Sequence, residues 1–211
     1  DLDTWASSTN AYVTTWYDQS GNGQHATQTT SSLQPKVIDN GSVILDSNGY
    51  AAIEFDGSDD FMQMPFAAGS NSGYLISTVC DPNNNTTNQN LIDFRDVNND
   101  GISLLGLSSG VIHARTDTVD ATKPYSGSAD LWTGEFTGSN VTAYVNGSGG
   151  TSLSGLNTSA TTNGRIGSPA YSVSSTWNGK LSEVVIYLTD QSSNRSNIES
   201  NIAGRYGITL S

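Results

Sequence analysis

The chain has 211 residues, and its 20 acidic and 8 basic side chains give a formal net charge of −12. This charge repels phosphate groups and anionic lipids, so it disfavours nucleic acid and membrane surfaces as partners. Only 13% of the residues are charged, and four Trp, nine Tyr and five Phe can build a core, unlike in acidic disordered chains. We therefore expect one folded domain over residues 1–211. No apolar run approaches the roughly 18 residues of a membrane span.

The first conspicuous motif is TWYDQSGNGQHATQ, residues 15–28, in which Asp18 is followed by the turn-forming run SGNG. We expect the Asp18 carboxylate to accept backbone N–H groups two and three residues further on. A nucleophilic Ser20 would need His25 and an orienting acid within hydrogen-bond reach, and the elbow pattern G-x-S-x-G is absent. The motif therefore predicts a structural turn.

Short alternating or β-branched runs recur along the chain between Gly- and Asn-rich turns. In chain order they are YVTTWY, PKVI, SVIL, AAIEF, FMQM, GYLISTV, LIDFR, ISLLGL, VIHAR, WTGEF, VTAYV, RIGS and LSEVVIYL. Turn signals such as DNGS, NNDG, TGSN and VNGSGG stand between them. About a dozen short strands at this spacing predict an antiparallel sandwich or jelly roll rather than βαβ units.

One helix is predicted near the C-terminus, in TDQSSNRSNIESNIAGRYG. Apolar side chains recur every four residues from Ile198 to Tyr206. Ser192 or Ser193 can cap the helix, and Gly207 is placed to end it. We expect a short helix packed on one edge of the sandwich.

Four stretches together resemble a known fold. WYDQSGNGQHAT looks like the D-x-S-G-N-G-x-H signature at the start of LamG-like, concanavalin A-like jelly-roll modules. AAIEFDGSDDFMQM, LWTGEFTGSNVTAYVNG and WNGKLSEVVIYLTDQSSNRSNIESNIAGRYGI agree with later parts of those modules in order. The resemblance implies a single LamG-like domain over residues 1–211, an all-β, concanavalin A-like antiparallel β-sandwich (jelly roll) with a short C-terminal helix.

The opening run is also similar to a run in the catalytic domain of family 54 α-L-arabinofuranosidases, which share the sandwich. That family's carboxylates do not carry over, because none of Glu54, Glu135, Glu183 and Glu199 aligns with its nucleophile. The adjacent cysteine pair of the family is missing as well. Retaining hydrolysis needs two carboxyl groups about 5 Å apart, one of them protonated.

Alternation predicts a charged patch on one sheet. Asp93 and Arg95 share a face of LIDFRD, and His113 and Arg115 share a face of VIHART. If these strands are neighbours, the four side chains form a candidate glycan groove, since sugars lie on the concave sheet of sandwich-fold lectins, hydrolases and lyases. The alternative is a solvated face with ordinary cross-strand pairs.

The aromatic residues divide into core and candidate ligand contacts. The resemblance marks Trp16, Trp132 and Trp177 as fold-determining, so we expect them in the core. Tyr125 and Tyr171 stand in the polar runs KPYSGSAD and SPAYSVSS. They are our candidate platforms for stacking on a sugar ring.

The same charged residues support an alternative activity. In a polysaccharide lyase, Arg95 or Arg115 would neutralise a uronate, His113 would act as the base, and Tyr144 would protonate the leaving oxygen. The negative net charge opposes a polyanionic substrate. The lyase is therefore the lesser hypothesis.

A second feature is DVNNDG, the first half of a calcium loop, with Asp96, Asn98 and Asp100 at alternate positions. The twelfth position holds Leu107 instead of the bidentate Glu. Calcium binding would therefore need ligands from other parts of the chain. A hairpin turn without a metal ion explains the same residues. Asp18 and the acids of DGSDD are rival ligands.

These observations predict a non-catalytic carbohydrate-binding or adhesion module of a larger secreted or virion protein. Its expected location is extracellular, and its partners are a glycan or polysaccharide and neighbouring domains or subunits, as for similar modules in phage tails and bacterial surface proteins. The alternatives are a polysaccharide lyase or glycoside hydrolase on the same sandwich, and a purely structural assembly module.

Overall fold

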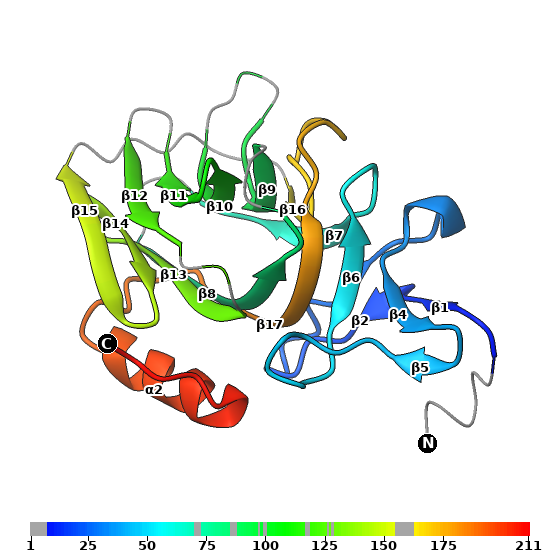
Figure 1. Cartoon of the computed structure of the whole chain (residues 1–211). Helices are drawn as coiled ribbons and strands as arrows, with labels where there is room; N and C mark the ends of the chain where they lie inside the picture. Colours follow the sequence, from blue (N-terminus) through cyan, green and yellow to red (C-terminus); the bar gives the residue numbers. More distant parts are fainter. Residues whose placement is uncertain are drawn as a thin grey trace.

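The protein is a two-layered β-sandwich with one α-helix on its outside (Figure 1). The computed structural model describes residues 8–69, 73–84, 88–96, 98, 101–116, 119–125, 127, 129–154 and 163–211. Within these ranges, the strands form a nine-stranded and an eight-stranded sheet whose strand pairs are antiparallel. The predicted fold class, an all-β jelly-roll sandwich with a short C-terminal helix, is confirmed.

Sheet A has the strand order β1-β4-β6-β17-β8-β13-β14-β15, with β5 paired to β4. Its strands are β1 (Ala11–Tyr12), β4 (Lys36–Asp39), β5 (Ser42–Val43), β6 (Ile53–Asp56), β8 (Tyr74–Pro82), β13 (Asp130–Phe136), β14 (Asn140–Val145), β15 (Ser148–Ser154) and β17 (Asn178–Tyr187).

Sheet B has the order β12-β11-β10-β9-β16-β7-β3-β2. Its strands are β2 (Thr15–Trp16), β3 (Ala26–Thr27), β7 (Met62–Ala67), β9 (Gln89–Asp93), β10 (Ser103–Ser108), β11 (Val111–Arg115), β12 (Asp120–Pro124) and β16 (Asn163–Ile166). A 3-10 turn, η1 (Ser31–Leu33), precedes β4.

The core lies between the two sheets and is built from the alternate, apolar residues of each strand. Trp132 and Trp177 are fully buried there, and their rings meet edge to face at 5.7 Å. Trp16 is half-buried against the same cluster. The predicted core role of the three tryptophans is confirmed.

Helix α2 (Arg195–Tyr206) packs on the outer face of sheet A, where Ile202 and Ala203 contact Val79 and Leu131. Gly207 ends the helix in the left-handed conformation, as predicted, with φ of 63°. The predicted serine cap is wrong, because Asn194 occupies the N-cap position and its side chain makes no capping hydrogen bond. Among the described residues, no helix has the length and apolar character needed to cross a bilayer.

Two edge strands, β12 and β15, were not predicted, because DATKP and SGGTSLS lack clear alternation. The turn signal VNGSGG is in fact a two-residue turn at Asn146 and Gly147, after which a strand begins. The two edges close one end of the sandwich: the Thr122 backbone N–H donates to Thr151 Oγ1 at 2.7 Å. A Cβ at Gly150 would lie 2.0 Å from the Thr122 carbonyl oxygen, so this approach requires glycine.

Candidate functional site

The opening motif is a turn held by its own aspartate. Asp18 accepts hydrogen bonds from the Ser20 backbone N–H at 2.8 Å, the Ser20 hydroxyl at 2.9 Å and the Gln24 backbone N–H at 3.0 Å. The backbone bonds from Ser20 and Gln24 lower the pKa of Asp18 to about 2. His25 Nδ1 accepts the Asp18 backbone N–H, and the Ser20 hydroxyl bonds to Asp18 and Asn22 and not to His25. The structural interpretation is confirmed, except that the second backbone donor lies six residues on, not three.

Helix α2 packs on sheet A, and within the described part of the chain no helix packs on the outer face of sheet B. One line of cross-strand partners crosses it from β3 to β12. We call this line the polar row, and its members are Thr27, Gln63, Arg165, Asp93, Ser103, Arg115 and Asp120. At about 4.8 Å between strands, the row spans roughly 30 Å.

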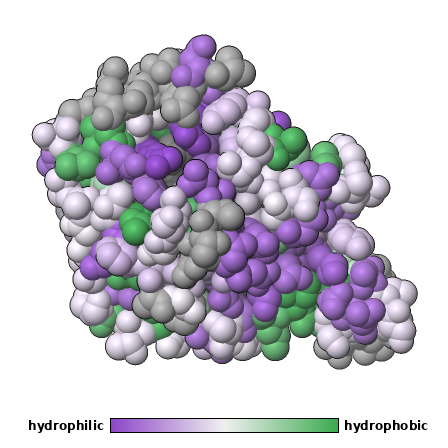
Figure 2. All heavy atoms as spheres, turned by 45° about the horizontal axis from the view of Figure 1, so that its top comes forward, coloured by the Kyte–Doolittle hydropathy of each residue, from purple (hydrophilic) through white to green (hydrophobic). Residues whose placement is uncertain are grey.

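The outer surface around this end of the molecule is hydrophilic. Figure 2 turns the top of Figure 1 towards the reader, and purple and pale side chains dominate the view, with green confined to small separate areas. A face whose described residues form no large apolar patch suits a polar ligand better than an apolar partner.

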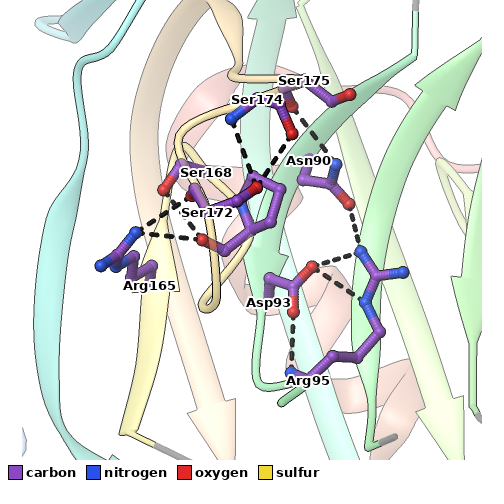
Figure 3. A network of polar contacts seen from close by, with 9 residues as sticks. Asn90, Asp93, Arg95, Arg165, Ser168, Ser172, Ser174 and Ser175 are labelled. Carbon is purple, nitrogen blue, oxygen red and sulfur yellow. Dashed lines mark hydrogen bonds and ion pairs between the residues drawn. The ribbon is translucent and has the colours of Figure 1, made fainter. Parts of the chain in front are cut away.

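Asp93, at the centre of the row, is bound by Arg95, two residues further along the chain (Figure 3). Asp93 accepts from Arg95 Nε at 3.0 Å, from its Nη2 and from its backbone N–H, while Arg95 Nη2 also donates to Asn90 Oδ1. Asp93 is fully buried and Arg95 is 5% exposed. Burial raises the pKa of Asp93, against the effect of Arg95. The prediction that these two side chains offer their charges to a ligand is therefore wrong.

A loop covers this ion pair. It comprises residues 167–177, which we call the covering loop, and it is fixed to β9 by a hydrogen bond from the Asn90 backbone N–H to the Ser175 carbonyl at 2.8 Å. Tyr171 in the loop is 38% exposed, and the Arg95 guanidinium lies 5.7 Å from its ring centroid. Tyr171 is accessible, as a stacking platform requires.

His113 and Arg115 form a second cluster with Asp120, a residue that sequence reasoning missed. His113 Nδ1 lies 2.9 Å from one Asp120 oxygen, and Arg115 Nη2 lies 2.9 Å from the other. Partial burial raises the pKa of Asp120, but the hydrogen bonds from His113 and Arg115 leave it below the usual value. Strand β10 separates β11 from β9, so the predicted single patch is two clusters along one row.

Tyr125 is partly buried, and its predicted contact with a sugar stays a prediction. Its ring meets Trp132 edge to face at 5.1 Å and packs against the core. Burial raises the pKa of its hydroxyl. The sequence showed a polar loop around Tyr125 but not the direction of its side chain.

The residues of the predicted lyase do not meet. Tyr144 lies on sheet A, where its hydroxyl donates to Glu135 Oε2 at 3.0 Å and the Arg195 guanidinium stacks on its ring at 3.8 Å. His113 lies on sheet B. The proposed trio of base, acid and neutralising arginine is therefore wrong as far as Tyr144 is concerned.

The predicted calcium loop is an aspartate turn in its described part. The Asn98 backbone N–H and side-chain amide donate to the two oxygens of Asp96, at 2.8 and 3.1 Å. Asp100 lies outside the described residues. Calcium binding by Asp96, Asn98 and Asp100 stays a prediction.

The acids of DGSDD lie together at the end of β6. One carboxylate oxygen from each of Asp56, Asp59 and Asp60 lies within 4.8 Å of the others. Asp60 accepts the Asp56 backbone N–H at 3.0 Å, and its burial raises its pKa to about 6. Asp56 and Asp60 line an open groove of about 450 Å³ that Tyr12 also borders.

Solved structures resemble this arrangement, although no protein-family model and no curated protein matches the sequence. A GH54 α-L-arabinofuranosidase soaked with a cyclic sulfate inhibitor has a TM-score of 0.69 and 15% identity over 95% of this chain and 52% of its own. Domain 4 of AbnA, a GH43 extracellular arabinanase from Geobacillus stearothermophilus, in complex with arabinotriose, has a TM-score of 0.55 and 16% identity over 72% of this chain and 80% of its own.

A third similar structure is the native heptameric SAP-like pentraxin from Limulus polyphemus, with a TM-score of 0.54 and 12% identity over 68% of this chain and 78% of its own. The fold is thus that of the concanavalin A-like sandwich, in a distant form. The chain spans about half the length of the arabinofuranosidases that it resembles. The narrower assignment to LamG-like modules, and the single-domain assignment, stay predictions.

Proposed function

We propose that this chain is a non-catalytic carbohydrate-binding module that binds a glycan along the outer face of sheet B. The observation that carries the proposal is the polar row, which crosses sheet B from β3 to β12 as one line of cross-strand partners, with the covering loop over its centre.

The chemistry of the row suits sugar hydroxyls, which both donate and accept hydrogen bonds. Thr27 offers a hydroxyl, Gln63 an amide, and Arg115 and Asp120 a charged donor and acceptor. Tyr171 stands in the loop above the row with an accessible ring that can cover the apolar face of a sugar. A few placed polar groups beside an aromatic ring are typical of ligand sites.

The non-catalytic assignment is supported by the state of the row's carboxylates. Asp93 is bound by Arg95, and Asp120 by His113 and Arg115. Neither acid is placed to donate or accept a proton at a sugar while those bonds persist, whereas glycoside hydrolysis requires two such groups.

The proposal includes a place in a larger extracellular protein. Domain 4 of the arabinanase is one domain of a larger extracellular enzyme, and its structure was solved in complex with arabinotriose. This chain matches most of that domain and half of a GH54 enzyme. By analogy, this chain would be a glycan-binding module beside a catalytic or adhesive domain of a larger protein. Calcium is the metal ion that we propose it binds.

A glycan array probed with the whole chain, with and without EGTA, tests binding and calcium together. For a glycan that binds on the array, Tyr171→Ala should weaken binding by about tenfold, because stacking and burial of the ring are lost. Tyr187→Ala is the matched control: Tyr187 is equally exposed, at 38%, but lies on β17 of sheet A. Equal losses in both variants, or an array without hits, would overturn the proposal.

The enzyme alternatives have their own readouts. Release of reducing ends would indicate a hydrolase, and formation of an unsaturated uronate would indicate a lyase. Either activity, persisting after purification to constant specific activity, would replace the non-catalytic assignment.

A further inference from the structure

Arg165 lies in the polar row between Gln63 and Asp93, and sequence reasoning did not single it out. The acid opposite to it, Asp93, is bound by Arg95. Arg165 makes no ion pair with any acid in the described ranges. Of the 20 acidic residues, only four lie outside these ranges, namely Asp1, Asp3, Asp100 and Asp117.

The Arg165 guanidinium is held in place without an acid. Its Nε donates to Gln63 Oε1 at 3.2 Å. Its Nη1 donates to the carbonyls of Pro169 at 3.2 Å and Ser172 at 3.0 Å, in the loop shown in Figure 3. It also stacks on the ring of Phe61, 4.2 Å from the centroid. A guanidinium has five N–H donors. The two on Nη2 have no partner among the described residues.

The Gln63 side chain that binds Arg165 is itself held by hydrogen bonds. The Gln63 amide nitrogen lies 3.2 Å from the carbonyls of Met64 and Asn163 and 2.9 Å from that of Gly164. These bonds orient the amide so that its oxygen faces Arg165. The cation is therefore held in one position before any ligand arrives, which reduces the entropy lost on binding.

The electrostatic setting favours an anion at Arg165. Burial lowers the pKa of Arg165, which reflects a cation that is partly removed from water, and Asp93 acts in the opposite direction. The carboxylate of this cross-strand partner is bound by Arg95. A ligand carboxylate would form a charge-assisted hydrogen bond with Nη2. The net charge of −12 repels polyanions, so a single carboxylate in an otherwise neutral ligand fits best.

Hydroxyl groups lie in the loop that binds the cation. The Ser172 and Ser174 hydroxyls are 2.9 Å apart in the covering loop, next to the carbonyl that binds Arg165 Nη1. Tyr171 precedes them with its exposed ring. A carboxylate site bordered by hydroxyls and an aromatic ring matches an acidic sugar more closely than a free inorganic anion.

We propose that Arg165 binds the carboxylate of an acidic sugar through Nη2, so that the preferred glycan carries a uronic acid in a largely neutral chain. This inference rests on the proposed glycan-binding function and names its ligand class.

The test compares the binding of sodium glucuronate with that of glucuronamide, a neutral sugar of nearly the same shape. Both are titrated into the ¹⁵N-labelled chain at fixed salt and followed by NMR. The Arg165 Nε–Hε signal, identified from its loss in Arg165→Gln, should shift with glucuronate. The affinity for glucuronamide should be at least tenfold weaker, and Arg165→Gln should lose the preference. The control is Arg205→Gln, because Arg205 is an exposed arginine that pairs with Glu183 on sheet A. This control should keep the preference.

The outcomes separate this inference from the proposed function. Equal binding of the acid and the amide by the wild-type chain overturns the role of Arg165, and it does so without relying on the folding of any variant. Neutral glycans that bind in a Tyr171-dependent manner would then leave the proposed function standing. Sulfate binding as tight as glucuronate binding would indicate an ion site without sugar recognition, and would also overturn the inference. Absence of binding by every glycan overturns both.

Discussion

Arg165 and Asp93 face each other across β16 and β9, but the Asp93 carboxylate binds Arg95 instead, two residues along its own chain. The Arg95 backbone N–H and guanidinium both donate to this carboxylate, so a local contact wins over the cross-strand one. The result is a neutralised, buried pair at the centre of the sheet and a clamped cation beside it.

Removing one member of the buried pair should be costly. Arg95→Met leaves the Asp93 carboxyl fully buried without its cation, so we expect a loss of about 3 kcal/mol in the free energy of unfolding, measured in urea at pH 7. Asp93→Asn with Arg95→Met should be less destabilised than Arg95→Met alone, because no unpaired charge remains. Arg115→Met, which breaks a half-exposed pair, should cost less than about 1 kcal/mol. Similar losses for Arg95→Met and Arg115→Met would contradict this account of the centre of the row.

The raised pKa of Asp60 predicts that the free energy of unfolding depends on pH. Its pKa is about 6 in the folded chain against 3.8 for the free group, so the folded state binds more protons between about pH 4 and 6. Stability should fall as the pH rises through this window. Asp60→Asn keeps an acceptor for the Asp56 N–H and should be more stable than wild type by about 2 kcal/mol at pH 8, with little difference at pH 4. Urea unfolding in EGTA measures this, and a pH-independent difference would refute it.

Asp18 should act in the opposite direction. Its pKa is lowered to about 2 in the folded chain, so its stabilising effect is present above about pH 4 and is lost as the pH falls towards 2. Asp18→Asn should lower the melting temperature at pH 7, and the difference should shrink with acidification. Asp190→Asn is the control: Asp190 accepts a backbone hydrogen bond from Ser192, whereas Asp18 accepts three hydrogen bonds. An effect of Asp190→Asn as large as that of Asp18→Asn would argue against the special role of the opening turn.

Two glycine substitutions should change stability in opposite directions. A Cβ on Gly164 would lie 2.4 Å from the Phe94 ring and 2.6 Å from Met64 Cε, so Gly164→Ala should destabilise the chain by about 2 kcal/mol through overpacking. A Cβ on Gly204, in helix α2, meets nothing within 4 Å. Gly204→Ala should therefore stabilise the chain by up to about 1 kcal/mol. Thermal unfolding of both variants checks the pair, and a stabilising Gly164→Ala would show that the core between β9 and β16 is looser than described.

Local patterns in the sequence were sufficient for the fold class. The short strands, the Asp18 turn and the end of the helix at Gly207 follow from side-chain alternation and backbone preference within a few residues. These features depend on neighbours along the chain, so they can be predicted without knowing how the strands pair. The core position of Trp132 and Trp177 was implied by the family resemblance. The edge strand β15 was not predicted, because Gly150 is needed for close contact with β12, and this contact exists only in the folded sandwich.

The site depended on contacts between distant parts of the chain. Alternation placed Asp93, Arg95, His113 and Arg115 on strand faces, but it did not show that β10 separates the two pairs or that the covering loop buries the first. Arg165 meets Gln63 across a separation of 102 residues. Sheet order, cross-strand register and loop coverage are set by the packing of the whole sandwich, and they decide which charges are neutralised and which remain available to a ligand.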